Sequence, residues 1–117
     1  MRHRKEGKKF NRLQGPRKAF LRNLTGDLIR VGSIETTEVR AKAIRPMVER
    51  FVTIAKRQTL AARRLLLARL HNERLVEKLL TDLGPRYQSR AGGYVRITKL
   101  SRTRKRDGAP VAKIEFI

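Results

Sequence analysis

The sequence predicts a two-layer α+β domain in which helices cover one face of a small sheet. Through the first two-thirds of the chain, apolar residues recur every three or four positions, which indicates helices. Near the C-terminus the pattern changes to alternation, which indicates strands. The length of 117 residues suits a single domain. The expected order is helix, strand, three helices and a two-stranded hairpin.

The first helix is expected to open at Gly15-Pro16, because proline fits a first helical position. Gly32 can take the left-handed conformation that ends a helix. Gly26, inside this helix, weakens it by about 1 kcal/mol relative to alanine, and close packing against a neighbour would be a reason to keep it. The apolar side of this helix consists of Phe20, Leu21, Leu24, Leu28 and Val31. The short β-branched stretch 33–37 predicts a strand.

The second helix is expected to begin near Thr37 or Glu38, and Pro46 predicts either a kink or a new helix start. Thr59 and Asn72 are candidate caps for the third and fourth helices, and Gly84-Pro85 is expected to end the fourth. The apolar stripe of the second helix is Val39, Ala43, Ile44, Met47, Val48, Phe51, Val52 and Ala55, and the third helix carries Ala62, Leu65, Leu66 and Leu70.

The hairpin is predicted from two β-rich segments, 94–100 and 111–117, with Asp107-Gly108 as the turn signal between them. Ala112, Ile114 and Phe116 alternate along the second segment, so they are expected to share one face of the strand.

The net charge is the abnormal property of this chain. Thirty Lys and Arg oppose ten Asp and Glu, which gives +20. A small domain needs a net charge of only about 2 to 8 for solubility, and a larger excess repels itself. A polyanionic partner is therefore predicted. The chain has no cysteine, so disulfides and thiolate chemistry are excluded. No apolar run approaches the roughly 18 residues of a membrane span, so no membrane partner is expected.

Candidate catalytic residues are few. His3 and His71 are far apart, and the ten acidic residues are scattered, whereas metal-dependent nuclease chemistry uses clustered carboxylates. Glu73 and Glu77 lie beside basic neighbours and are better explained as surface ion pairs. We therefore expect no enzyme activity, no metal, no cofactor and no small-molecule substrate.

The basic residues fall into groups. Residues 1–14 are predicted to form a basic extended arm, with a reach of about 46 Å when fully extended, and residues 15–117 a single RNA-binding domain. The arm's candidate RNA contacts are Arg2, His3, Arg4, Lys5, Lys8, Lys9, Asn11 and Arg12. Three further groups are Arg17, Lys18 and Arg22; Arg63 and Arg64; and Arg102, Arg104, Lys105 and Arg106. A lone charged run is usually a solvated face, but several arginine-rich groups on one small chain favour contact with phosphates.

Gly92-Gly93 form the last candidate site, with Arg86, Arg90 and Arg96 nearby in the sequence. Glycines let a backbone approach a sugar-phosphate chain closely. A plain turn entering a strand explains them equally well. Few aromatic residues are present and none forms an RNP-like set, so the partner is expected to be folded, helical RNA read by its backbone and shape.

Two alternatives share the charge. A nucleoid-type DNA-binding protein would be a dimer with paired arms entering a groove. A basic RNA-processing enzyme would show turnover that one carboxylate substitution abolishes.

Several motifs, in order along nearly the whole chain, resemble the L17 family of bacterial large-subunit ribosomal proteins. They are Met1-Arg2-His3-Arg4-Lys5 with Gly7 and Asn11-Arg12; Arg22-Asn23; Ile34-Glu35-Thr36-Thr37 with Ala41-Lys42; Ile54-Ala55-Lys56; Arg63-Arg64; Arg90-Ala91-Gly92-Gly93-Tyr94-Val95-Arg96-Ile97; Gly108-Ala109-Pro110; and Ile114-Glu115-Phe116.

This resemblance implies a structural protein of the ribosome that binds large-subunit ribosomal RNA near the peptide exit region, beside neighbouring large-subunit ribosomal proteins, in the cytoplasm. It also implies the same order of helices and strands. This chain departs from the family at two places. It has Val31-Gly32 where a histidine is common in the family, and Val95 where a threonine is usual. Pro46 has no counterpart in the pattern.

Overall fold

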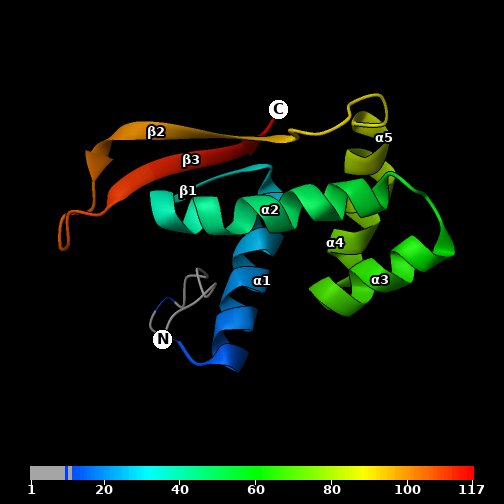
Figure 1. Ribbon diagram of the computed structural model, residues 1–117, viewed down its shortest axis with the longest axis horizontal. Coiled ribbons are helices and arrows are strands. Elements are labelled where there is room, and N and C mark those ends of the chain that lie inside the picture. Colours follow the sequence, from blue (N-terminus) through cyan, green and yellow to red (C-terminus); the bar gives the residue numbers. More distant parts are fainter. Residues whose placement is uncertain (1–9, 11) are drawn as a thin grey trace, which may run out of the picture.

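The computed structural model describes residues 10 and 12–117 (Figure 1). Most of the predicted arm, residues 1–9 and 11, lies outside the described residues. The predicted contacts at Arg2, His3, Arg4, Lys5, Lys8, Lys9 and Asn11 fall there. Of the remaining arm residues, Gln14 already belongs to the first helix.

The sheet has three antiparallel strands in the order β1-β3-β2: β1 is Ser33–Thr37, β2 is Val95–Thr103 and β3 is Pro110–Phe116. Ile114 of β3 pairs with Ile34 on one side and Ile97 on the other, so an apolar row crosses the sheet. The predicted hairpin and the short strand are confirmed. Sequence reasoning did not state that the strand joins the hairpin through β3.

Helices α1 (Gln14–Val31) and α2 (Glu38–Ala55) pack on one face of this sheet (Figure 1). Their contact buries Leu28 and Ile44 against Val95 and Ile114. The two-layer α+β prediction is therefore confirmed. Gly32 ends α1 with a φ of 94°, as predicted. Val31 is 63% exposed, so its expected burial is wrong; Ile29 is buried instead.

Helix α2 is continuous through the exposed Pro46, so a new helix does not begin there. The helix begins at Glu38, as predicted, and Thr37 caps it by accepting a hydrogen bond from the Arg40 N–H at 3.3 Å. Val39 is 47% exposed and does not join the apolar stripe. Ile54, which was left out of the predicted stripe, is buried.

The chain then forms α3 (Leu60–Leu70), α4 (Glu73–Lys78), a π-helical turn η1 (Leu79–Leu83) and the short α5 (Gly84–Arg86). Thr59 caps α3 and Asn72 caps α4, as predicted. Of the apolar residues predicted for the third helix, Leu65 is 37% exposed and its neighbour Leu66 is buried. These helices pack against the C-terminal half of α2 around a second apolar cluster that includes Phe51, Leu79 and Tyr94 (Figure 1).

The predicted helix end at Gly84-Pro85 is wrong. Gly84 has helical dihedrals, and its N–H bonds to the Leu79 carbonyl, five residues back. The π-turn leaves the Leu80 carbonyl free to accept a hydrogen bond from the Gln58 amide at 2.9 Å. A Cβ on Gly84 would lie 2.9 Å from Gln58 Nε2 and 3.0 Å from the Ala55 carbonyl oxygen. Glycine at this position therefore permits close packing against the end of α2.

Gly26 has a similar role. A Cβ there would lie 2.9 Å from the Leu75 side chain, so α1 and α4 approach each other at this residue. The expectation that close packing justifies a glycine inside the first helix is confirmed.

Candidate nucleic-acid interface

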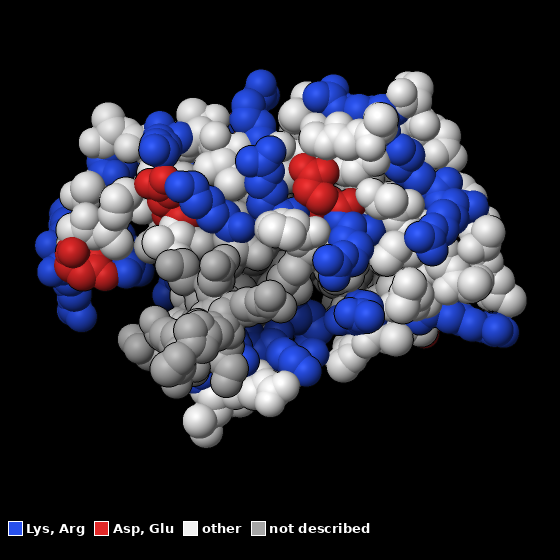
Figure 2. Space-filling view, viewed as in Figure 1, with Lys and Arg blue, Asp and Glu red and all other residues white. Residues whose placement is uncertain are grey.

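Lysine and arginine side chains are spread over the whole face in Figure 2, and acidic side chains show in only a few places. The helices and the hairpin both contribute to this basic surface. Two arrangements occur among the cations of residues 12–117. Some form ion pairs with carboxylates of the same chain, and others have no such partner within the described residues.

Four of the predicted contacts lie at the end of the hairpin: Arg102, which was expected in the loop, belongs to β2, whereas Arg104, Lys105 and Arg106 are in the loop itself. Arg102 pairs with Glu35 of β1, and Arg104 pairs with Asp107 within the loop. The hydrogen bond from Arg104 is the main reason that the pKa of Asp107 lies below its ordinary value. The other two, Lys105 and Arg106, are exposed and have no carboxylate within 4 Å in the described part of the chain.

Arg40, at the start of α2, lies near both the hairpin loop and Phe20 of α1. Its guanidinium lies 5.0 Å from the centroid of the Phe20 ring, and that of Arg12 lies 3.9 Å from the same ring. Arg12, Arg40 and Arg104 also line one shallow hollow. Sequence reasoning missed Arg40, because no charged run marks it. The only signal for Arg40 in the sequence is its position three residues after Thr37, which places it on the first turn of α2.

Of the three arginines around Gly92-Gly93, Arg90 is the one that hydrogen-bonds to the glycines in the described part of the chain. Its Nε donates to the Gly92 carbonyl at 3.2 Å and to the Gly93 carbonyl at 3.1 Å. Arg86 instead pairs with Asp82 at 2.9 Å, and Arg96 pairs with Glu115 at 3.5 Å.

The two glycines differ from each other. Gly93 has a φ of 65°, in the left-handed region, so its own backbone conformation favours glycine. Gly92 has no positive φ, and a Cβ there would meet no atom within 4 Å. Nothing within the described part of the chain therefore requires glycine at position 92.

The glycine loop is fixed to α2 by two charged side chains that sequence reasoning did not single out. The carboxylate of Glu49 accepts hydrogen bonds from the Tyr94 N–H at 3.0 Å and the Val95 N–H at 3.3 Å. The Lys56 ammonium donates to the Arg90 carbonyl and, at 3.0 Å, to the Tyr94 hydroxyl. The Lys56 hydrogen bond is the main reason that the pKa of the buried Tyr94 is lowered.

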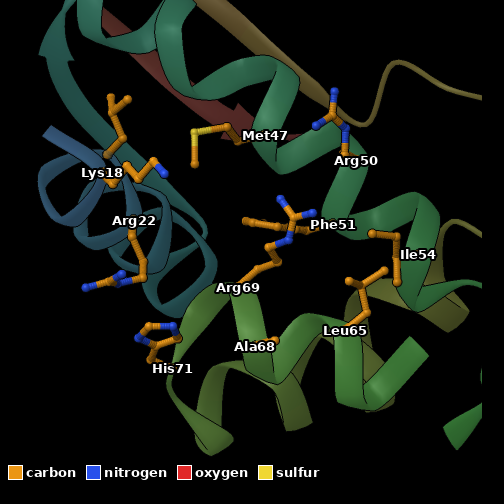
Figure 3. A pocket seen from close by; sticks show the side chains of 11 residues that line it. Lys18, Arg22, Met47, Arg50, Phe51, Ile54, Leu65, Ala68, Arg69 and His71 are labelled. Atoms are coloured by element: carbon orange, nitrogen blue, oxygen red, sulfur yellow. The ribbon is translucent and has the colours of Figure 1, made fainter. Parts of the chain in front are cut away.

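Lys18 and Arg22 of α1 line a deeper hollow between α1, α2 and α3, together with Arg50 and Arg69 (Figure 3). Sequence reasoning missed Arg50 and Arg69, because neither belongs to an arginine run. The other predicted residues of α1 and α3 lie outside this lining: Arg17 is half-buried, Arg64 is exposed, and Arg63 pairs with Glu77 of α4 at 2.8 Å.

Within residues 10 and 12–117, no three His, Asp or Glu side chains gather into a group that could hold a metal ion. In the same part of the chain, no helix is long and apolar enough to cross a membrane.

The fold and its basic surface define a small, strongly basic α+β protein with arginines and lysines spread over its surface. Residues 20–117 match the family described as ribosomal protein L17. The chain is 47% identical to the large ribosomal subunit protein bL17 of Maridesulfovibrio salexigens, over 99% of this chain and 82% of the relative. It is 48% identical to the protein of that name from Gemmatimonas aurantiaca, over 100% of this chain and 98% of the relative. The chain belongs to the ribosomal protein L17 family.

Proposed function

We propose that this protein is a structural constituent of the large ribosomal subunit, where it binds and stabilises large-subunit ribosomal RNA through its basic N-terminal arm and arginine-rich loops. It resides on ribosomes in the cytoplasm, next to other large-subunit proteins, and catalyses no reaction. The observation that carries this proposal is near-full-length similarity to two proteins named as large ribosomal subunit proteins, joined to a net charge of +20.

The exposed ion pairs support this function because they are exchangeable. A surface ion pair contributes only about 0 to 1 kcal/mol. A phosphate offers the same guanidinium a bidentate, doubly hydrogen-bonded partner. Arg102, Arg86 and Arg96 can therefore leave Glu35, Asp82 and Glu115 for RNA phosphates at little cost to the fold.

Gly92 supports a close approach of RNA to the glycine loop. Its position meets open space and its backbone conformation is available to other residues. A substitution to valine should thus leave the fold intact and test the approach directly. Gly93→Val is a poorer test, because its left-handed φ strains the backbone even without RNA.

The experiment is a salt titration of binding to large-subunit ribosomal RNA. We expect log Kd to rise by roughly 0.7 to 0.9 per unit of log salt for each phosphate contacted. Removing residues 1–9 should lower this slope and leave the circular dichroism spectrum of the domain unchanged. Duplex DNA is the competitor control. A Kd that does not change with salt concentration, or a lower Kd for duplex DNA than for the RNA, contradicts the proposal.

A further inference from the structure

The hollow between α1, α2 and α3 has a volume of about 670 Å³. Met47 and Phe51 of α2 and Leu65 of α3 form its apolar floor. Figure 3 shows Arg69 extending from α3 toward Phe51, with Lys18 and Arg22 on α1 at the opposite side. The hollow thus combines an apolar floor with a basic rim.

The rim charges lack the neutralising partners found elsewhere. Lys18, Arg22, Arg50 and Arg69 form no ion pair with any carboxylate in residues 12–117. No acidic residue lines the hollow. Leu65 remains 37% exposed on its floor. An occupant that complements this surface carries negative charge and one apolar face.

The size of the hollow selects among such occupants. Its volume lies within the roughly 300 to 1,000 Å³ of sites for single small ligands. An acidic amphipathic helix would need apolar contacts repeated over several turns along a groove. A nucleotide supplies both required features in one unit, since its base is flat and largely apolar on its faces and its phosphates are anionic.

We propose that this hollow receives one RNA base extruded from its helix. The base packs on Met47, Phe51 and Leu65, and the flanking phosphates contact Lys18, Arg22 and Arg69. This proposal rests on the proposed function and adds a specific mode of recognition to it, because unpaired bases are the usual targets of specific RNA recognition.

The lining also indicates how the base is recognised. Its hydrogen-bonding side chains are Lys18, Arg22, Arg50, Arg69 and His71, and the four cations among them donate to acceptor atoms on a base edge. The nucleotide is therefore selected because it is unpaired and correctly placed, and a base edge with acceptor atoms, such as guanine O6 and N7, suits these donors best.

Helix α3 offers a matched pair of test positions. Leu65 lines the hollow and is 37% exposed, whereas Leu67 is 38% exposed and lies outside the lining. Leu65→Glu and Leu67→Glu change the net charge equally, so their effects on long-range attraction cancel in the comparison. We expect Leu65→Glu to weaken binding to large-subunit ribosomal RNA about tenfold more than Leu67→Glu, the size of one lost base contact.

A photo-crosslinking residue, p-benzoylphenylalanine, at the same two positions of the full chain then identifies the occupant. Crosslinking from position 65 should map to a single nucleotide that is unpaired in the RNA, and crosslinking from position 67 should not. Circular dichroism checks that every variant folds.

The outcomes separate the two proposals. If the unmodified protein fails to bind the RNA, both the proposed function and this inference are refuted. If it binds but the two glutamate variants are equally affected, only the extruded base is refuted. A crosslink from position 65 to another protein, to a second copy of this chain, to a base-paired nucleotide, or to nothing also refutes it.

Discussion

Two loops of this protein carry the same sequence signals and differ in how they are held. The loop 88–94 and the hairpin loop 104–109 each contain an arginine and a glycine with a φ of 65°, Gly93 in one and Gly108 in the other. The first loop is anchored by two side chains, Glu49 within α2 and Lys56 at the C-cap of that helix. The second is held mainly by its own groups, with Arg104 and the Ala109 N–H both bonded to Asp107.

The comparison shows that similar basic glycine loops can present charge in two ways. The anchored loop keeps one backbone conformation because its contacts come from a packed helix. The self-contained loop can exchange its internal contacts for external ones, because none of them connects it to the core. We infer a fixed docking surface in the first case and an adaptable contact in the second.

The largest expected effect tests the anchor. Glu49→Ala removes two charge-assisted hydrogen bonds to the backbone of the first loop, and we expect a loss of about 2 kcal/mol in the free energy of unfolding. Asp107→Ala, which removes the partner of Arg104 and of the Ala109 N–H in the hairpin loop, should cost less because these groups are exposed to solvent. Urea unfolding of both variants measures the difference. Equal losses would mean that the first loop is no better anchored than the second.

A smaller effect is expected from alanine at the two left-handed glycines. In both positions a Cβ meets no atom within 4 Å, so only backbone strain differs from the native chain. Gly93→Ala should destabilise the protein by about 1 kcal/mol, since the anchored loop cannot relax. Gly108→Ala should cost about half as much. A larger loss for Gly108→Ala, again from urea unfolding, would reverse the assignment of rigid and adaptable loops.

The smallest effect on stability concerns Lys56. Lys56→Met should raise the pKa of Tyr94, because it removes the hydrogen bond that lowers it. The stabilisation from a lowered folded-state pKa is fully present above the unfolded tyrosine value of about 10 and is lost as pH falls through the folded value. At neutral pH the variant should therefore lose only about 0.5 kcal/mol, from the hydrogen bonds themselves.

Absorbance titration of the tyrosines measures this change, with Lys42→Met as the control. Lys42 pairs with Glu38 at the other end of α2 and should leave the titration unchanged. An unaltered tyrosine titration in Lys56→Met would show that Lys56 does not hold the first loop through Tyr94.

Local signals in the sequence predicted most of the fold. Gly32, Thr59 and Asn72 act where they were expected, because each depends on its own backbone conformation or on hydrogen bonds to near neighbours in the chain. Gly84 was misread, because the reason for it is a contact with Ala55 and Gln58, more than twenty residues away. A glycine required by distant packing looks the same in sequence as a glycine that ends a helix.

The candidate interface was less predictable for a related reason. A charged run drew attention to Arg63, and the glycine pair drew attention to Arg86 and Arg96, but the fold pairs all three with acids. Isolated cations such as Arg40, Arg50 and Arg69 became candidates only when α2 and α3 brought them beside α1 and the hairpin. Sequence shows where charge is dense, whereas the fold decides which charges remain available.

The position of β3 between β1 and β2 has a consequence for how the chain folds. β3 follows every other described element, and neither neighbouring strand pairs with the other. Phe116 of β3 also packs against both apolar clusters. During synthesis the sheet therefore cannot form, and the apolar clusters cannot be fully buried, until β3 has left the ribosome. We expect the domain to fold late and in one cooperative step.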